Sequence, residues 1–548
     1  MNKFSTLDRK KSLKKLSEDH FDLVIIGGGI TGAGIALDAS SRGMKVALVE
    51  KNDFASGTSN KSTKLVHGGL RYLKQFDFWL VKEVGSERAI VHKVAPHLVI
   101  PEKMILPLIK GGTYGTWLTS IGLKVYDILA NVEGDDKRKM LDKEEALKLE
   151  PLLPEDILEG AGFYAEYRTD DARLTLEILK TALNYKTTAL NYCEVTGFEY
   201  ENDKVCGVQV VDVIAGGKIA IKATYVVNAT GPWVDELRQI NNSKTGKYLH
   251  LTKGVHLVIP HKIFPVKHAV YFDIPDGRMM FAIPRGKTTY IGTTDTNYQG
   301  DKDHIDVEDV DALYLISAVN NMFPSINLSI ADIESSWAGV RPLIHEEGKS
   351  PSELSRKDEI FVSDTGLISI AGGKLTGYRK MAERTVDLVA KKYKKKYDKK
   401  FKDIQTHNLT LCGGDFKNYK EVVKYINAVF KILKPSGLKE LDARYLVHNY
   451  GTQTDTVLEQ FNTIKEADPE LRLLKAELWF CIQFEMVQNP CDFFIHRTGR
   501  LYFDIASVKK FKQPILEEFS KVFNWNPEIL KKHSNDLETA IENATRFK

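Results

Sequence analysis

A glycine-rich turn between two short apolar runs is the feature that most constrains this chain. The motif Gly27-x-Gly29-x-x-Gly32 follows the apolar run 23–26 and opens the proline-free segment 30–41; a second apolar run, 44–49, leads to Glu50. Strand, glycine turn, helix and strand in this order predict a dinucleotide-binding βαβ unit. The first glycine permits a tight turn, the second lets the backbone approach a pyrophosphate, and the third lets helix and strand pack closely. The pyrophosphate would lie at the positive end of the helix, with Glu50 on the adenosine ribose.

Later segments predict two sheets and a separate helical region. The run 225–227 enters a turn at 228–231, and the run 367–370 leads into a helix over about 376–393. Alternating apolar and polar residues predict antiparallel strands at 255–259, 279–283 and 288–292. Beyond the lysine-rich stretch 391–402 the pattern is helical, with one apolar face made by Leu471, Leu474, Leu478, Cys481 and Ile482.

Composition excludes several classes of protein. The 77 Lys and Arg residues nearly balance 73 Asp and Glu residues, which argues against a nucleic-acid partner. The five cysteines contain no C-x-x-C pair, so neither a disulfide framework nor a metal site is expected. The basic segment 9–16 is not followed by an apolar stretch of the kind a signal peptide has. We therefore expect a cytoplasmic protein.

Two further segments are candidates for contact with the cofactor, although the glycine motif alone does not separate NAD from FAD. The hydroxyl-rich loop 57–63 begins soon after the ribose acid, and the turn at 228–231 follows a second strand. Either could hydrogen-bond a dinucleotide, and either could be an ordinary turn.

Several long motifs, in order, resemble those of the FAD-dependent glycerol-3-phosphate dehydrogenases. The first is Gly27-Gly28-Gly29-x-x-Gly32-Ala33-Gly34, and the last in the α/β region is Gly372-Gly373-Lys374-x-x-Gly377-Tyr378-Arg379. Between them lie family-like stretches at 64–73, 168–173 and 339–343, and the tail carries Arg497-Thr498-Gly499-Arg500. The close resemblance covers about residues 21–385.

The resemblance implies a fold and a division of the chain. It implies an α/β protein with a Rossmann-like FAD-binding domain, an antiparallel-sheet substrate domain like those of glutathione reductase and amino-acid oxidases, and an all-α C-terminal domain. We expect FAD and substrate parts within 20–390, a basic linker at 391–404 and the helical domain at 405–548. The FAD parts would be 20–75, 150–240 and 340–390; the substrate sheet would be 76–149 and 241–339.

The resemblance also implies the reaction: oxidation of sn-glycerol 3-phosphate to dihydroxyacetone phosphate in glycerol degradation, with FAD accepting hydride and quinone receiving the electrons. A phosphate dianion requires cations, and arginine offers bidentate contacts. Arg71 and Arg341 are the candidates. His256 matches the family's active-site histidine and is the expected base, with His67 as runner-up.

The remaining site residues complete the prediction. Tyr72 is expected to touch substrate, and Lys374 to stabilise negative charge on the flavin. The expected cofactor-binding residues are Gly27, Gly28, Gly29, Ile30, Thr31, Gly32, Glu50, Lys51, Thr58, Ser59, Ser62, Thr63, His67, Gly68, Gly69, Ala229, Gly231, Gly373, Lys374, Leu375 and Thr376.

Three alternatives stay open. A glycerophosphate oxidase would pass electrons to oxygen and make hydrogen peroxide, but such enzymes commonly carry an inserted segment that is not seen here. An amino-acid oxidase would not need two arginines for phosphate, and a flavin-binding interaction protein would bind FAD without turnover.

Because a quinone-linked enzyme must reach the bilayer, the lysine run predicts peripheral contact with an anionic membrane surface. A homodimer is a further expectation.

Overall fold

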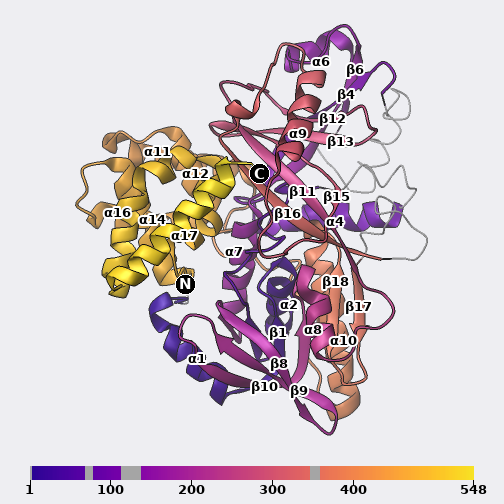
Figure 1. Cartoon of the computed structure of the whole chain (residues 1–548), viewed down its shortest axis with the longest axis vertical. Coiled ribbons are helices and arrows are strands. Elements are labelled where there is room, and N and C mark those ends of the chain that lie inside the picture. The colour runs from indigo at the N-terminus through magenta and orange to yellow at the C-terminus, as the bar shows by residue number, and fades with distance from the viewer. Residues whose placement is uncertain (1–2, 68–77, 113–137, 346–357, 548) are drawn as a thin grey trace.

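The computed structural model describes residues 3–67, 78–112, 138–345 and 358–547, and Figure 1 shows an α/β body with a helical C-terminal domain on one side. The predicted fold class is confirmed. The predicted residues Gly68, Gly69, Arg71 and Tyr72 lie outside the described residues. No helix in the described ranges is both long and apolar enough to cross a bilayer.

The first sheet has the order β17-β18-β10-β1-β2-β7, with β8 and β9 added through β10. From β18 to β7 neighbouring strands are parallel, and their apolar residues are buried because helices cover them. These strands are β1 (His20–Ile26), β2 (Val46–Val49), β7 (Thr187–Leu190), β8 (Cys193–Glu201), β9 (Lys204–Asp212), β10 (Lys218–Asn228), β17 (Asp358–Val362) and β18 (Ile368–Gly372).

The second sheet is mainly antiparallel, in the order β15-β11-β14-β13-β12-β4-β6-β3, with β16 paired to β11 and β5 to β6. This confirms the antiparallel sheet expected from the alternating segments. Its strands are β3 (Leu65–Val66), β4 (Ile100–Ile109), β5 (Lys139–Leu141), β6 (Leu158–Arg168), β11 (Leu249–Pro260), β12 (Ala269–Asp273), β13 (Met279–Arg285), β14 (Thr288–Gly292), β15 (Thr296–Asn297) and β16 (Ser335–Ile344).

Two strands and the end of a third depart from the expected division of the chain. We expect 20–75, 150–240 and 340–390 to belong with the FAD parts, but β3 and β6 lie in the second sheet, where β6 pairs with β3 and β4. The end of β16 passes position 340 and stays paired with β11 in the same sheet. The burial pattern along a strand indicates which face is covered and not which strand lies beside it, so packing decides the partner. The later strands of segment 150–240, β7 to β10, join the first sheet.

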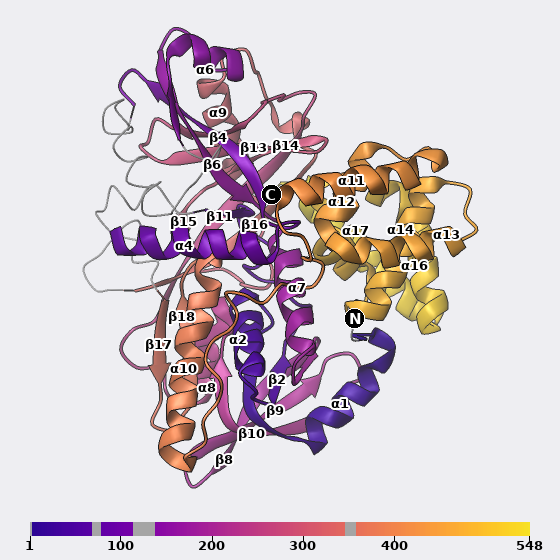
Figure 2. The ribbon, with the colours of Figure 1, turned by 180° about the vertical axis from the view of Figure 1, so that it is seen from behind.

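Helices cover the first sheet and form the C-terminal domain. Helix α2 contacts both α7 and α10, as Figure 2 shows, and is therefore buried on nearly all sides. Helix α10 continues through Tyr397, so the first part of the lysine run is helical. The helices of the body are α1 (Arg9–Glu18), α2 (Ile30–Ser41), α4 (Phe78–Val94), α6 (Lys143–Leu149), α7 (Asp171–Leu183), α8 (Val234–Ile240), α9 (Asp309–Met322) and α10 (Tyr378–Tyr397).

The C-terminal domain is all helical, as expected. Its helices are α11 (Tyr419–Leu433), α12 (Glu440–Tyr450), α13 (Thr454–Thr463), α14 (Pro469–Phe484), α15 (Arg500–Phe503), α16 (Ile505–Phe523) and α17 (Pro527–Thr545). The apolar face predicted between Leu471 and Ile482 is the buried face of α14. The chain's N-terminal end lies beside this domain in both views, where Thr6 donates a hydrogen bond to the Val487 carbonyl oxygen.

Candidate active site

The glycine turn lies at the carboxyl end of β1, where β2 pairs on one side and β10 on the other. Gly27 has a φ of +109°, and a Cβ there would lie 2.6 Å from the Ala229 carbonyl oxygen. A Cβ on Gly32 would collide with the Gly27 carbonyl oxygen. The first and third glycines therefore have the turn and packing roles that the sequence assigns, at the switch point where open α/β sheets bind ligands.

A cavity of about 330 Å³ opens at this turn. Most of the predicted cofactor residues line it. Arg341 and Lys374, which are expected to act on the substrate phosphate and on the flavin, line it as well. The predicted cofactor residues on its wall are Gly27, Gly29, Ile30, Thr31, Glu50, Lys51, Thr58, Ser59, Ser62, Thr63, His67, Ala229, Gly231, Gly373, Lys374, Leu375 and Thr376. Gly28 and Gly32 do not line it; they shape the turn behind it.

The predicted ribose acid is held by the turn itself. Glu50 accepts hydrogen bonds from the backbone N–H of Gly28 (2.7 Å) and of Asn52 (2.9 Å). Burial raises the pKa of Glu50, and these two bonds act in the opposite direction. The carboxyl group is fixed at the cavity wall, where its remaining acceptor capacity can receive ribose hydroxyls.

The hydroxyl-rich loop joins the two sheets across the cavity. Ser59 Oγ accepts the Ile30 N–H at 2.9 Å, at the first turn of α2, and Thr58 Oγ1 donates to the Val340 carbonyl at 2.7 Å. Ser62 donates to Asp171 at 2.6 Å. The loop thus lies at the N-terminus of α2, the end of a helix that favours a pyrophosphate. Glycines without room for a side chain, the acid and this helix N-terminus together fit a dinucleotide.

Arg341 is anchored at the far side of the cavity by three hydrogen bonds. Its guanidinium donates to the Thr294 carbonyl (3.0 Å), to Asp295 Oδ1 (3.0 Å) and to Thr293 Oγ1 (2.8 Å). Lys374 precedes the short turn Leu375–Gly377, and Thr376 in that turn donates to the His67 carbonyl at 3.3 Å. Two cations from different sheets therefore reach the same cavity as the glycine turn.

His256 lies behind the cavity wall and does not line it. It is 1% exposed and stacks on Trp337 with ring centroids 4.8 Å apart. Its Nε2 lies 3.0 Å from Oγ1 of Thr63, which does line the cavity, and its Nδ1 has no partner among the described residues. Burial, together with Arg341 and Lys64, holds the pKa of His256 well below its usual range. The ring is therefore neutral, and it is a weak base while Arg341 and Lys64 keep their full effect on it.

Sequence reasoning missed several residues of the wall. Lys61 lines the cavity, and burial lowers the pKa of its ammonium group. The Trp233 ring lies under Lys51, whose Nζ is 4.4 Å from the ring centroid, and would crowd a side chain at position 57. Glu194 comes from the start of β8. Lys61 lies in the loop already singled out, whereas no local pattern marks the other two.

The FAD-dependent oxidoreductase family matches residues 22–379, and a family described as the C-terminal domain of alpha-glycerophosphate oxidase matches residues 404–529. An aerobic glycerol-3-phosphate dehydrogenase of Bacillus subtilis is 50% identical over 546 residues, covering 99% of this chain and 98% of that protein. The corresponding Staphylococcus epidermidis protein is 49% identical over 543 residues, covering 98% of each chain.

Solved structures agree with these matches. The glycerol-3-phosphate dehydrogenase of Bacillus halodurans, complexed with FAD, is 43% identical, covers 99% of both chains and superposes with a TM-score of 0.84. An L-alpha-glycerophosphate oxidase from Mycoplasma pneumoniae shares the fold, with a TM-score of 0.56 over 71% of this chain and 97% of that chain at 20% identity. FAD is accordingly the cofactor that the cavity fits. The chain belongs to the FAD-dependent oxidoreductases and, within them, to the aerobic glycerol-3-phosphate dehydrogenase family.

Proposed function

We propose that this chain oxidises sn-glycerol 3-phosphate to dihydroxyacetone phosphate with FAD and passes the electrons to a quinone. One observation carries the proposal: the cavity that holds the dinucleotide turn also holds Arg341, a cation suited to a phosphate dianion, and Lys374, a cation suited to negative charge on the flavin. Relatives about 50% identical over nearly the whole chain are named aerobic glycerol-3-phosphate dehydrogenases, which supports the substrate and the oxidation. An amino-acid oxidase would have no phosphate to bind with Arg341.

The residues that would hold FAD are the glycine turn, Glu50 and the hydroxyl loop, and FAD when bound supplies the acceptor for hydride from the substrate carbon. The protein's part is to place the alcohol. Arg341 is fixed by Asp295 and by the Thr294 carbonyl, so its guanidinium would meet the phosphate without reorganising. Lys374 would stabilise negative charge on the flavin. Arg71 stays a prediction for the same phosphate, and Tyr72 stays a prediction for contact with the substrate.

We propose His256 as the proton acceptor, reached through Thr63. The substrate hydroxyl would give its proton to Thr63 Oγ1 while Thr63 gives its own proton to His256 Nε2, which is 3.0 Å away. A bound phosphate dianion would offset the charge of Arg341, one of the two cations that lower the pKa of His256. Substrate binding would thereby make the histidine a stronger base.

An anaerobic spectrum tests the proposal. The purified protein should absorb near 450 nm, bleach when sn-glycerol 3-phosphate is added and stay unchanged with glycerol, which lacks the phosphate. A soluble quinone should then restore the absorbance faster than oxygen does. Rapid restoration by oxygen with stoichiometric hydrogen peroxide would favour the glycerophosphate oxidase, a family that the C-terminal match also names. Bleaching by amino acids but not by sn-glycerol 3-phosphate would refute both the dehydrogenase and the glycerophosphate oxidase.

The exposed lysines at the end of α10 support a peripheral place on the cytoplasmic face of a membrane. Lys394, Lys395 and Lys396 are exposed in the last turn, where basic side chains also favour the helix dipole. Each would contribute about 1 kcal/mol near anionic lipid. Co-sedimentation with phosphatidylglycerol vesicles at low salt, lost at high salt and absent with phosphatidylcholine, is the expected result. Equal recovery with both lipids would contradict it. A homodimer and the linker at 391–404 stay predictions.

A further inference from the structure

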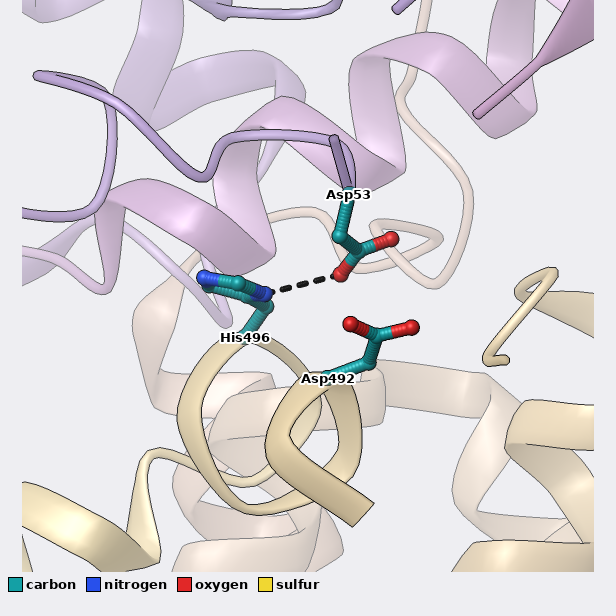
Figure 3. Close-up of side chains that lie close together, drawn as sticks. All are labelled: Asp53, Asp492 and His496. Atoms are coloured by element: carbon teal, nitrogen blue, oxygen red, sulfur yellow. Dashed lines mark hydrogen bonds and ion pairs between the residues drawn. The ribbon is translucent and has the colours of Figure 1, made fainter. Parts of the chain in front are cut away.

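Residues of the C-terminal helical domain contact segment 50–57, which lines the cofactor cavity, on the side away from the cavity. Asp53 lies three residues after the ribose acid, in the segment 50–57 that contributes much of the cavity wall, and it is buried. Its carboxylate accepts Arg497 Nη2 on Oδ1 at 2.9 Å and Arg497 Nη1 on Oδ2 at 2.5 Å. His496 Nδ1 lies 2.8 Å from Oδ2, and Figure 3 shows this contact. Although burial raises it, Arg497 and His496 hold the pKa of Asp53 well below its usual range.

The guanidinium of Arg497 connects this segment to the backbone of the helical domain. Its Nε and Nη2 donate to the Glu485 carbonyl oxygen at 3.1 and 2.7 Å. The Glu485 carboxylate in turn accepts both terminal nitrogens of Arg173, at 2.6 and 2.7 Å, and Arg173 belongs to α7 of the body. Asn191 adds a neutral tie, since its Nδ2 donates to Asp53 at 2.8 Å and to the Met486 carbonyl at 3.0 Å.

Backbone hydrogen bonds carry this constraint to the cavity. The Ser56 N–H donates to the Asp53 carbonyl at 3.2 Å, and the Ala55 N–H donates to the Gly28 carbonyl at 3.1 Å. On the other side, the Cys193 N–H donates to the Glu50 carbonyl at 2.7 Å. Anchoring Asp53 therefore restricts both the ribose acid and the glycine turn. A charged pair of this kind is costly to break, because it leaves a buried charge without a partner.

The cluster is not a metal site in the form described. Asp53, Asp492 and His496 offer ligand atoms within 4.8 Å of one another, and Figure 3 shows the two carboxyl groups side by side. Both oxygens of Asp53, however, already accept bonds from Arg497. The guanidinium thus supplies the positive charge that an ion would bring.

We propose that Arg497 is a positioning residue through which the C-terminal domain keeps segment 50–57 in the shape that binds FAD. FAD affinity and docking of the helical domain are then thermodynamically linked, so each strengthens the other by the same factor. The inference rests on the cofactor and not on the substrate, so it can fail while the proposed reaction stands.

The test compares full-length variants of two arginines in the same motif. Arg497→Met removes the tie to Asp53, whereas the control Arg500→Met removes an ion pair with Glu477 inside the helical domain, 3.0 Å long. The FAD dissociation constant is measured by diluting the holoprotein and following the fluorescence of released FAD, and unfolding is measured alongside. We expect Arg497→Met to raise the constant at least tenfold, Arg497→Lys to recover part of it, and Arg500→Met to change it less than twofold.

Hydrogen exchange on the wild-type protein keeps the inference testable if Arg497→Met does not fold. FAD binding should slow amide exchange at 485–497, which lies outside the cavity wall, while leaving α11 unchanged. An unchanged dissociation constant in a folded Arg497→Met protein would overturn the inference. Equal weakening of FAD binding in Arg497→Met and Arg500→Met would also overturn it. So would an amide exchange rate at 485–497 that is the same with and without FAD.

Discussion

Replacing Thr63 by valine should isolate the buried histidine from the cavity while keeping nearly the same side-chain shape. The Thr63 hydroxyl lies 3.0 Å from His256 Nε2, and the histidine is 1% exposed, so bulk water cannot take the place of the hydroxyl. A positioned general base contributes about 10²- to 10⁴-fold to a rate. Since the path to that base passes through Thr63, we expect bleaching by sn-glycerol 3-phosphate to slow by about 10²-fold or more.

The same change should also destabilise the fold. Nδ1 of His256 has no described partner, so loss of the Thr63 bond leaves both ring nitrogens unpaired, at a cost of about 1–3 kcal/mol. Anaerobic rapid mixing measures the bleaching rate, urea unfolding measures the stability, and Thr63→Ser, which keeps the hydroxyl, is the control. A valine variant with full FAD content and a rate within threefold of wild type would refute the proton path.

Three other changes test separate parts of the site. Arg341→Met should raise the substrate concentration for half-bleaching about 10- to 100-fold with FAD content unchanged, because a charge-assisted contact worth about 1.5–3 kcal/mol is lost. Gly32→Ala should cut bound FAD, read as the ratio of absorbance at 450 and 280 nm, more than tenfold because its Cβ meets a backbone oxygen; Gly217→Ala, in open space, should not. Burial and Asp53 raise the pKa of Asp492 to about 8 from 3.8, so the folded protein binds the extra proton and loses stability as pH rises through this interval. The free energy of unfolding should fall less steeply with pH in Asp492→Asn than in the wild type, by up to about 1.4 kcal/mol per pH unit. Urea unfolding at several pH values measures this slope.

Each of these predictions has a result that contradicts it. If Arg341→Met is half bleached at the same substrate concentration as the wild type, this arginine does not bind the phosphate. Equal FAD content in the two glycine variants would remove the packing argument at position 32. Parallel stability curves for wild type and Asp492→Asn would mean that this carboxyl group does not take up a proton on folding.

The local parts of the site follow directly from the sequence. The helix expected at 30–41 is α2 with the same bounds, because the glycine turn and the following Gly43 delimit it. This turn and helix depend on a few neighbouring residues, and the spacing of those residues records them. Arg341 and Lys374 lie on the cavity wall, but only the resemblance to the family points to them in the sequence.

The non-local parts do not follow from the sequence. His256 was expected at the substrate, but the structure places it behind Thr63, a separation that depends on how β11, β16 and the hydroxyl loop pack. In the sequence Arg497 belongs only to a tail motif, and its partner Asp53 lies 444 positions away. Charge type and burial select such partners after the domains have docked, so no period or spacing in the chain marks them.

A single-turnover experiment without oxygen tests the central claim most directly. The holoprotein is mixed with one equivalent of sn-glycerol 3-phosphate per FAD, and the absorbance at 450 nm and the dihydroxyacetone phosphate formed are both measured. The account predicts that bleaching and product appear together in a ratio of one, and that glycerol gives neither. Flavin that stays oxidised, or that bleaches without dihydroxyacetone phosphate, would contradict it.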